Sequence, residues 1–141
     1  MIKFEDNYFQ KFDFSRKQVK KYLDSARKDL KIAKESDIVD VRFQFSYNSL
    51  IKLGVALIAC HGYKVRARVG HHVKILEKIS EMLNDENILI YGNQMRKTRN
   101  TELYDGGIII TDKRAEEYFD FVLRLADSSG GILKKYLDAL L

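Results

Sequence analysis

The chain has 141 residues, of which 45% are hydrophobic and 32% are charged. This length fits one domain with its own core, and this composition excludes wholesale disorder. The net charge of +5 at pH 7 is compatible with an anionic partner such as nucleic acid, but it is too small to establish one.

Several absences narrow the class of protein further. Cys60 is the only cysteine, so an intrachain disulfide is excluded. The longest apolar stretch, residues 53–60, is too short to span a bilayer, and residues 1–10 lack the apolar core of a signal peptide. Proline is absent, which permits long helices. We therefore expect a cytoplasmic, helical protein with no membrane segment.

Residues 1–13 are rich in aromatic side chains, and the first helix follows them. We expect this N-terminal extension to fold over one end of the domain, although its rings could instead stack on nucleic-acid bases. Ser15 and Gln18 have the spacing of a capping box, and Phe14 and Val19 have that of a hydrophobic staple. An amphipathic helix is therefore predicted to begin after Ser15.

Two further helices are predicted before the middle of the chain. Ser36 or Asp37 is expected to cap the second helix, which ends at residues 61–62. It is the most apolar helix, so we expect it to be central. Gly70 opens the third helix, which ends at the polar pair 84–85.

The C-terminal part of the chain is predicted to hold the remaining helices. The fourth extends over about residues 86–104, with a glycine stop at 106–107. Thr111 or Asp112 begins the fifth, and the small polar residues 128–131 are expected to break it before a short last helix.

Short connections between long amphipathic segments predict that successive helices run antiparallel. The expected fold is all-α: an up-and-down antiparallel bundle of four main helices with an additional C-terminal helix or helices. We expect residues 1–141 to form this single domain. The β-branched run 108–110 is too short to build a sheet alone.

The fourth predicted helix has an arginine where its apolar seam should continue. Ile88, Tyr91 and Met95 recur at three- and four-residue steps, and the next position on that seam is Arg99. A guanidinium group that faces a core or an interface needs an anionic or hydrogen-bonding partner, because burying it without one costs roughly several kcal/mol. Arg99 is therefore expected to bind a phosphate, to lie at a subunit interface, or to form a structural salt bridge.

The sequence around this arginine resembles the signature region of HEPN domains (higher eukaryotes and prokaryotes nucleotide-binding). In that family an arginine, often followed by asparagine, precedes a histidine by four to six residues, and Arg99 and Asn100 match this pattern. The segments 61–64 (HGYK) and 70–73 (GHHV) are similar to the link between the second and third helices of many prokaryotic members. The resemblance covers about residues 40 to 125, and it implies a helical bundle.

The chain departs from the family's nuclease motif at one position, where Tyr104 replaces the histidine. Members that keep the histidine resemble metal-independent endoribonucleases, in which the imidazole moves protons and the arginine neutralises the scissile phosphate. A phenol is a poor proton acceptor at neutral pH. The resemblance therefore implies a site of Arg99, Asn100 and Tyr104 in which ribonuclease activity is weak or lost.

The resemblance also implies partners. Nucleases of the family often pair about a twofold axis, which implies a homodimer with the fourth helix near its interface. Similar members often occur beside a minimal nucleotidyltransferase as toxin and antitoxin, and in some cases the transferase modifies a tyrosine near the motif. Tyr104 is a candidate target by this analogy, although packing at the helix end is a simpler role for it.

The densest basic segment lies between the second and third predicted helices. With two cations of the fourth helix, it supplies the candidate nucleic-acid-binding residues: Lys64, Arg66, Arg68, His71, His72, Arg96 and Lys97. These residues could follow a phosphate backbone, or they could form an ordinary solvated surface. Adjacent histidines cannot form the i,i+4 pair of helical metal sites, so we expect no metal and no cofactor.

The sequence leaves three functional hypotheses. The first is a HEPN-like toxin–antitoxin component or accessory protein that binds RNA or nucleotides through a dimeric basic groove centred on Arg99. The second is a non-catalytic module that docks a partner such as a minimal nucleotidyltransferase, with Arg99 as an interface salt bridge. The third is a true ribonuclease that uses Asn100, Tyr104 or a histidine from the second connection.

Overall fold

Helices dominate the described part of the chain. The computed structural model describes the backbone of residues 2–104 and 110–139, and the side chains of residues 2–101 and 110–136. Within these ranges it has five helices and one two-stranded sheet. The elements are β1 (Phe9–Lys11), α1 (Arg16–Glu35), α2 (Val39–Cys60), β2 (Tyr63–Val65), α3 (His71–Leu83), α4 (Glu86–Tyr104) and α5 (Asp112–Ala139).

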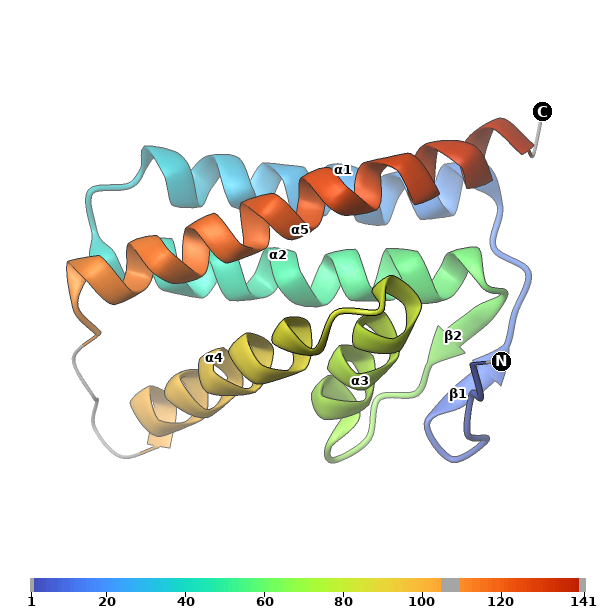
Figure 1. Ribbon diagram of the computed structural model, residues 1–141, viewed down its shortest axis with the longest axis horizontal. Coiled ribbons are helices and arrows are strands. Elements are labelled where there is room, and N and C mark those ends of the chain that lie inside the picture. The colour runs from blue at the N-terminus through green and yellow to red at the C-terminus, as the bar shows by residue number, and fades with distance from the viewer. Residues whose placement is uncertain (1, 105–109, 140–141) are drawn as a thin grey trace.

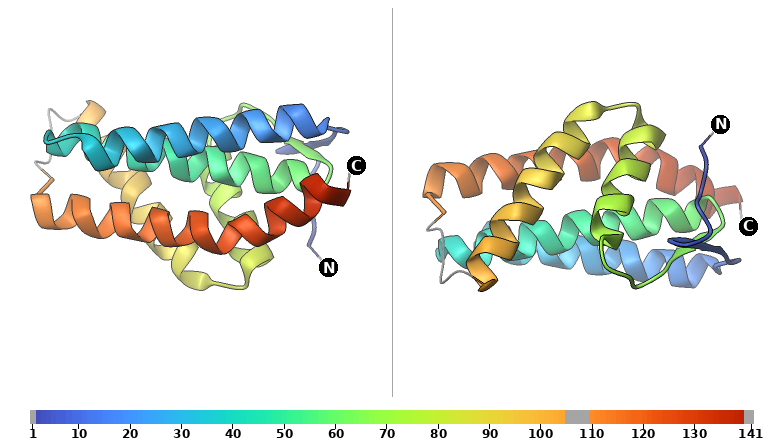
Figure 2. Two further views of the ribbon diagram at one scale, coloured as in Figure 1. Left: turned by 90° about the horizontal axis from the view of Figure 1, so that it is seen from above. Right: turned by 90° about the horizontal axis from the view of Figure 1, so that it is seen from below.

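The helices form two sets with different directions. Helices α1, α2 and α5 lie along the long axis of the molecule, whereas α3 and α4 run obliquely below them (Figure 1). The views from above and below show the same division (Figure 2). The chain runs in one direction through α1 and in the opposite direction through both α2 and α5 (Figure 1). A mostly helical bundle is therefore confirmed, but α3 and α4 do not continue a simple alternation of antiparallel helices.

The predicted start of α1 is confirmed. The Ser15 hydroxyl oxygen accepts a hydrogen bond from the Gln18 backbone N–H (3.2 Å), and the Gln18 side-chain oxygen accepts one from the Ser15 N–H (2.9 Å). These two bonds satisfy donors that would otherwise be free in the first turn. The apolar stripe of α1, which includes Val19 and Leu30, is buried against the core.

The predicted cap of α2 is wrong, whereas its central position is confirmed. Ile38 occupies the N-cap without a side-chain bond, and the Ser36 hydroxyl oxygen instead accepts a hydrogen bond from the Ile38 N–H (3.1 Å). By length and composition α2 is the one described helix that could cross a membrane. However, 61% of its most apolar window is buried inside the bundle, as in the core helix of a soluble protein.

Gly70 begins α3, as predicted, and has a φ of 82°, which glycine adopts readily.

Two other glycines, one on α2 and one on α4, allow α3 to pack very close to these two helices. A Cβ atom at Gly54 of α2 would lie 2.3 Å from Ile75 Cγ2, and one at Gly92 of α4 would lie 2.6 Å from Leu76 Cδ2. Both distances are shorter than van der Waals contact. Helix α3 can therefore pack this closely against α2 and α4 only because residues 54 and 92 have no side chain.

The predicted break at residues 128–131 is wrong, because α5 continues through them to Ala139. Two glycines in a helix interior cost about 1 kcal/mol each relative to alanine. Tertiary contacts offset that cost: Leu133 is 1% exposed, and the Tyr136 hydroxyl donates to the Phe14 carbonyl (3.3 Å). The predicted glycine stop at 106–107 lies outside the described residues.

The N-terminal extension folds over one end of the helices, as expected. The sequence pattern predicts no strand, yet β1 and β2 pair antiparallel with Phe9 opposite Val65. The Phe9 side chain is 1% exposed and belongs to a small cluster with Ile58 and Ile75. A segment of three residues is too short to give a period-2 signal, so the pairing follows from burial of Phe9 rather than from a strand pattern.

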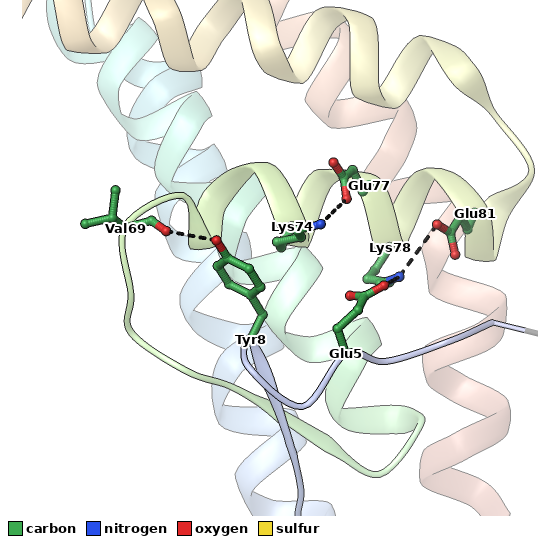
Figure 3. Close-up of polar contacts among 7 residues, drawn as sticks. All are labelled: Glu5, Tyr8, Val69, Lys74, Glu77, Lys78 and Glu81. Carbon is green, nitrogen blue, oxygen red and sulfur yellow. Dashed lines mark hydrogen bonds and ion pairs between the residues drawn. The ribbon is translucent and has the colours of Figure 1, made fainter.

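Polar contacts hold the same extension against α3 (Figure 3). The Lys78 ammonium is 3% exposed and lies 2.9 Å from a Glu5 carboxylate oxygen and 3.6 Å from one of Glu81. The Tyr8 hydroxyl donates to the Val69 carbonyl oxygen (3.3 Å), just before α3. These contacts fix the loop that leads into the first turn of α3.

Candidate functional site

Helices α2, α3 and α4 bring a tyrosine, a histidine and an arginine together. The Tyr47 hydroxyl oxygen of α2 lies 2.8 Å from His72 Nδ1 at the start of α3. The guanidinium carbon of Arg99, on α4, lies 5.5 Å from the centroid of the Tyr47 ring. The Tyr47 side chain is 1% exposed, and those of His72 and Arg99 are partly buried. The predicted inward position of Arg99 is thus found.

The close helix packing explains how these three side chains meet. Gly54 lies seven residues after Tyr47 on α2, and Gly92 lies seven residues before Arg99 on α4. Residues seven apart share a helical face, as do His72 and the α3 residues 75 and 76 that contact these glycines. Tyr47, His72 and Arg99 therefore lie on the faces of α2, α3 and α4 that approach one another most closely.

Positive charge gathers at this point without a described counter-charge. Arg96 lies one turn before Arg99, and its Nε donates to the Asn93 side-chain oxygen (3.3 Å). Among the described side chains, no carboxylate forms an ion pair with Arg96 or Arg99. The His71 ring lies 4.4 Å from that of His72. We call Tyr47, His71, His72, Arg96 and Arg99 the α2–α3–α4 cluster.

Burial keeps His72 and Tyr47 uncharged at neutral pH. Desolvation, with smaller effects from His71, Arg99 and Arg96, lowers the pKa of His72 from its ordinary 6.5 to about 4. Desolvation also raises the pKa of Tyr47 from 10.0 to about 12, although Arg99 and Arg96 act in the opposite direction. At neutral pH His72 and Tyr47 therefore add no charge to the two arginines.

Hydrogen bonding assigns the proton positions on the two imidazoles. The buried Tyr47 O–H needs an acceptor, and among the described residues its partner is His72 Nδ1. Tyr47 therefore donates to Nδ1, and neutral His72 has its hydrogen on Nε2. His71 Nδ1 lies 2.6 Å from the Arg68 carbonyl oxygen, which can only accept. His71 thus donates from Nδ1, and in its neutral form Nε2 has a free lone pair.

The remaining predicted basic residues before α3 have structural contacts of their own. Arg66 Nε donates to the Asp6 carbonyl (2.9 Å), and Arg68 donates to the Asn7 carbonyl (2.8 Å). Lys64 lies on β2, with its ammonium 5.6 Å from the centroid of the Phe12 ring. These three residues hold or cover the N-terminal extension, and the described contacts do not join their side chains to Arg99.

Two other candidates on α4, Lys97 and Asn100, have exposed side chains. Lys97 is exposed and lines a groove of about 430 Å³ with Gln94 and Arg114, on the α5 side of the helix. Asn100 is exposed and makes no side-chain hydrogen bond with another described residue. The side chain of Tyr104 lies outside the described residues, so its predicted catalytic or modified role stays a prediction.

Tyr47 is the member of the cluster that the sequence does not single out. It lies on the apolar stripe of α2, where an aromatic residue normally belongs to the core. The one available signal is chemical, because a buried phenol needs a hydrogen-bond partner for its hydroxyl group. The sequence does not reveal that this partner is a histidine 25 residues further along the chain.

The described residues include no group of three or more histidine, cysteine, aspartate or glutamate side chains placed to hold a metal ion. The chemistry available to the cluster is therefore that of fixed positive charge, N–H donors and one imidazole lone pair. Comparisons with protein-family models, curated protein sequences and solved structures find no match to this chain.

Proposed function

We propose that this chain is a HEPN-like protein that binds RNA or nucleotides through the α2–α3–α4 cluster. The observation that carries the proposal is the position of Arg99: it is partly buried against Tyr47, beside Arg96 and a neutral His72, with no described carboxylate partner. Two partly buried guanidinium groups without a described carboxylate partner favour an anion, and phosphate oxygens match their paired N–H donors. The cationic surface would supply the salt-dependent part of RNA affinity.

The wider identity rests on the sequence resemblance. We propose that the protein is a toxin–antitoxin component or accessory protein of the cytoplasm, that it forms a homodimer near α4, and that it pairs with a nucleotidyltransferase. The finer fold expected from the sequence, an up-and-down antiparallel bundle of four main helices with an additional C-terminal helix or helices, belongs to this proposal. The lengthwise alignment of α1, α2 and α5 supports it, whereas the oblique α3 and α4 depart from it (Figure 1).

RNA affinity of Arg99 variants tests the proposal. Arg99→Ala should weaken binding of a labelled single-stranded RNA by about tenfold or more, since hydrogen bonds to charged groups contribute about 1.5–3 kcal/mol. It should also reduce the slope of log affinity against log salt by about 1. Arg27→Ala is the matched control, because Arg27 is exposed on α1, across α2 from α4 (Figure 1).

The outcomes separate two classes of function. Equal losses of RNA affinity in Arg99→Ala and Arg27→Ala would contradict the proposal, because they would show that RNA responds only to the overall surface charge. If Arg99→Ala leaves RNA affinity intact but abolishes binding of a co-expressed nucleotidyltransferase, the protein-docking function is favoured instead. Circular dichroism should give the same helical signal for all variants, which excludes misfolding as the cause.

One observation favours ribonuclease activity as a second candidate function. The structure places the ring of His71, a histidine from the second connection, 4.4 Å from that of His72, and its Nε2 has the free lone pair that a general base requires. In this reaction Nε2 would take the proton of a ribose 2′-hydroxyl, whose oxygen attacks the phosphorus. The 5′-oxygen would leave and take a proton from water, giving a 2′,3′-cyclic phosphate.

Cleavage assays distinguish this activity from binding alone. Metal-free cleavage of labelled RNA should disappear in His71→Ala, while RNA affinity in the same variant falls little. Cleavage that persists in His71→Ala would rule out His71 as the base. Absence of cleavage by the unaltered protein would leave binding as the function of the cluster.

A further inference from the structure

We propose that the α2–α3–α4 cluster recognises a terminal phosphate, carried by a nucleotide or by a phosphorylated RNA end, in preference to an internal phosphodiester. This inference rests on the proposed function, because it names the ligand class of the same site. It has three supports, namely the positive charge of the cluster, its free N–H donors and the position of the hydrogen on His72.

The charge of the cluster matches a dianion. Arg99 lies against the buried Tyr47 ring, and Arg96 lies one helical turn before Arg99, so the cluster has two permanent positive charges. No described carboxylate forms an ion pair with either arginine. An internal phosphodiester has one negative charge and would leave one guanidinium group uncompensated. A phosphomonoester has a charge of about −1.5 to −2 at pH 7 and compensates both.

The free N–H groups are also numerous enough to contact three unesterified phosphate oxygens. Arg99 makes no hydrogen bond to a described residue, and Arg96 uses only its Nε. Each guanidinium can present two parallel N–H groups to a phosphate. A terminal phosphate offers three unesterified oxygens, whereas an internal phosphodiester offers two.

His72 adds a donor without adding a charge. Tyr47 donates to its Nδ1, which leaves the hydrogen of neutral His72 on Nε2, and Nε2 has no hydrogen bond to a described residue. The third phosphate oxygen can accept from this group. The Tyr47 hydroxyl group therefore acts as a positioning group, because it fixes which nitrogen of His72 can donate.

The test uses one RNA sequence in three forms with an internal fluorophore: a 5′-phosphate, a 3′-phosphate, or hydroxyl groups at both ends. Fluorescence anisotropy gives the three affinities. Adenosine 5′-monophosphate and adenosine serve as competitors and distinguish a free nucleotide from an RNA end as the source of the phosphate. The proteins are the unaltered chain, Arg96→Ala, Arg99→Ala, Arg99→Lys and the control Arg27→Ala.

A phosphorylated oligonucleotide should bind about tenfold or more tightly than the hydroxyl-ended one, which is about 1.4 kcal/mol. Arg96→Ala and Arg99→Ala should remove this difference, Arg99→Lys should keep part of it, and Arg27→Ala should keep all of it. Competition by the monophosphate but not by adenosine identifies a nucleotide ligand. A phosphate preference without such competition identifies an RNA end.

Equal affinities for all three oligonucleotides, each weakened by Arg99→Ala, would overturn the terminal-phosphate assignment and leave RNA binding at the cluster intact. If none of the oligonucleotides or competitors binds, or if Arg99→Ala changes no affinity, both this inference and the proposed function fail. A Tyr47→Phe variant separates positioning from packing, because it keeps the ring beneath Arg99. It should lower the preference for the phosphorylated oligonucleotide more than it lowers affinity for the hydroxyl-ended one.

Discussion

Replacement of Gly54 by alanine should destabilise the protein and disturb the candidate site. The new Cβ would lie 2.3 Å from Ile75 Cγ2, so α3 must move away from α2 or Ile75 must leave its rotamer. Overpacking of this kind costs about 1–3 kcal/mol, whereas alanine in place of a helical glycine contributes about 1 kcal/mol of stability. The expected net effect is a loss of up to about 2 kcal/mol.

Gly130→Ala provides the matched control, because a Cβ at Gly130 of α5 meets no described atom within 4 Å. This variant should gain up to about 1 kcal/mol. Urea denaturation followed by circular dichroism gives both free energies of unfolding. In Gly54→Ala, movement of α3 should also separate His72 from Tyr47 and weaken RNA binding. An increase in stability equal to that of Gly130→Ala would refute the close packing of α2 and α3.

Four further predictions concern titration and buried polar contacts. Because the pKa of His72 is lowered to about 4, the unfolded chain binds more protons below pH 6.5, so stability should fall as the pH drops from about 6.5 to 4. Urea denaturation across this range should show a weaker fall in His72→Gln, and an unchanged fall would contradict a neutral His72. Glu5→Ala should lower stability by about 1–3 kcal/mol, because the buried Lys78 ammonium would keep only Glu81 as a partner. Lys78→Met should lower stability less, because it removes the buried charge itself. Equal losses of stability in the two variants would contradict this explanation. The pKa of Glu5 is lowered chiefly by its hydrogen bond to Lys78, so the stabilisation from this pair should be present above about pH 4.5 and should disappear on further acidification, which the same denaturation series measures. Tyr47→Phe should cost about 1 kcal/mol by removing a buried hydrogen bond, and a stabilised variant would indicate that the hydroxyl group lacks its partner.

The helices could be predicted from the sequence because their signals are local. The capping box at Ser15, the left-handed glycine at Gly70 and the apolar periodicity of each segment act within a few residues, and the structure places α1, α3 and α4 accordingly. The errors arose where tertiary contacts decide the outcome. Helix α5 continues past Gly130 because Leu133, three residues later, is buried in the core. Strand β1 forms because the Phe9 side chain is buried.

The candidate site was predictable only in part. An arginine on an apolar seam is visible in the sequence, and Arg99 does face inward. Its neighbours depend on how α3 crosses α2 and α4, which the close packing at Gly54 and Gly92 sets. No local pattern encodes that crossing, so the sequence does not show that His72 lies beside Tyr47. Nor does it show that Arg66 and Arg68 donate to backbone carbonyl groups of the N-terminal extension.

The most direct test of the central claim is a nuclear magnetic resonance titration of the isotope-labelled protein with adenosine 5′-monophosphate. Phosphate binding at the cluster should shift the imidazole signals of His71 and His72 and the side-chain Nε signal of Arg99, in a saturable manner, while the Nε signal of Arg27 stays in place. Shifts confined to other parts of the chain, with the signals of His72 and Arg99 unchanged at saturation, would contradict the account.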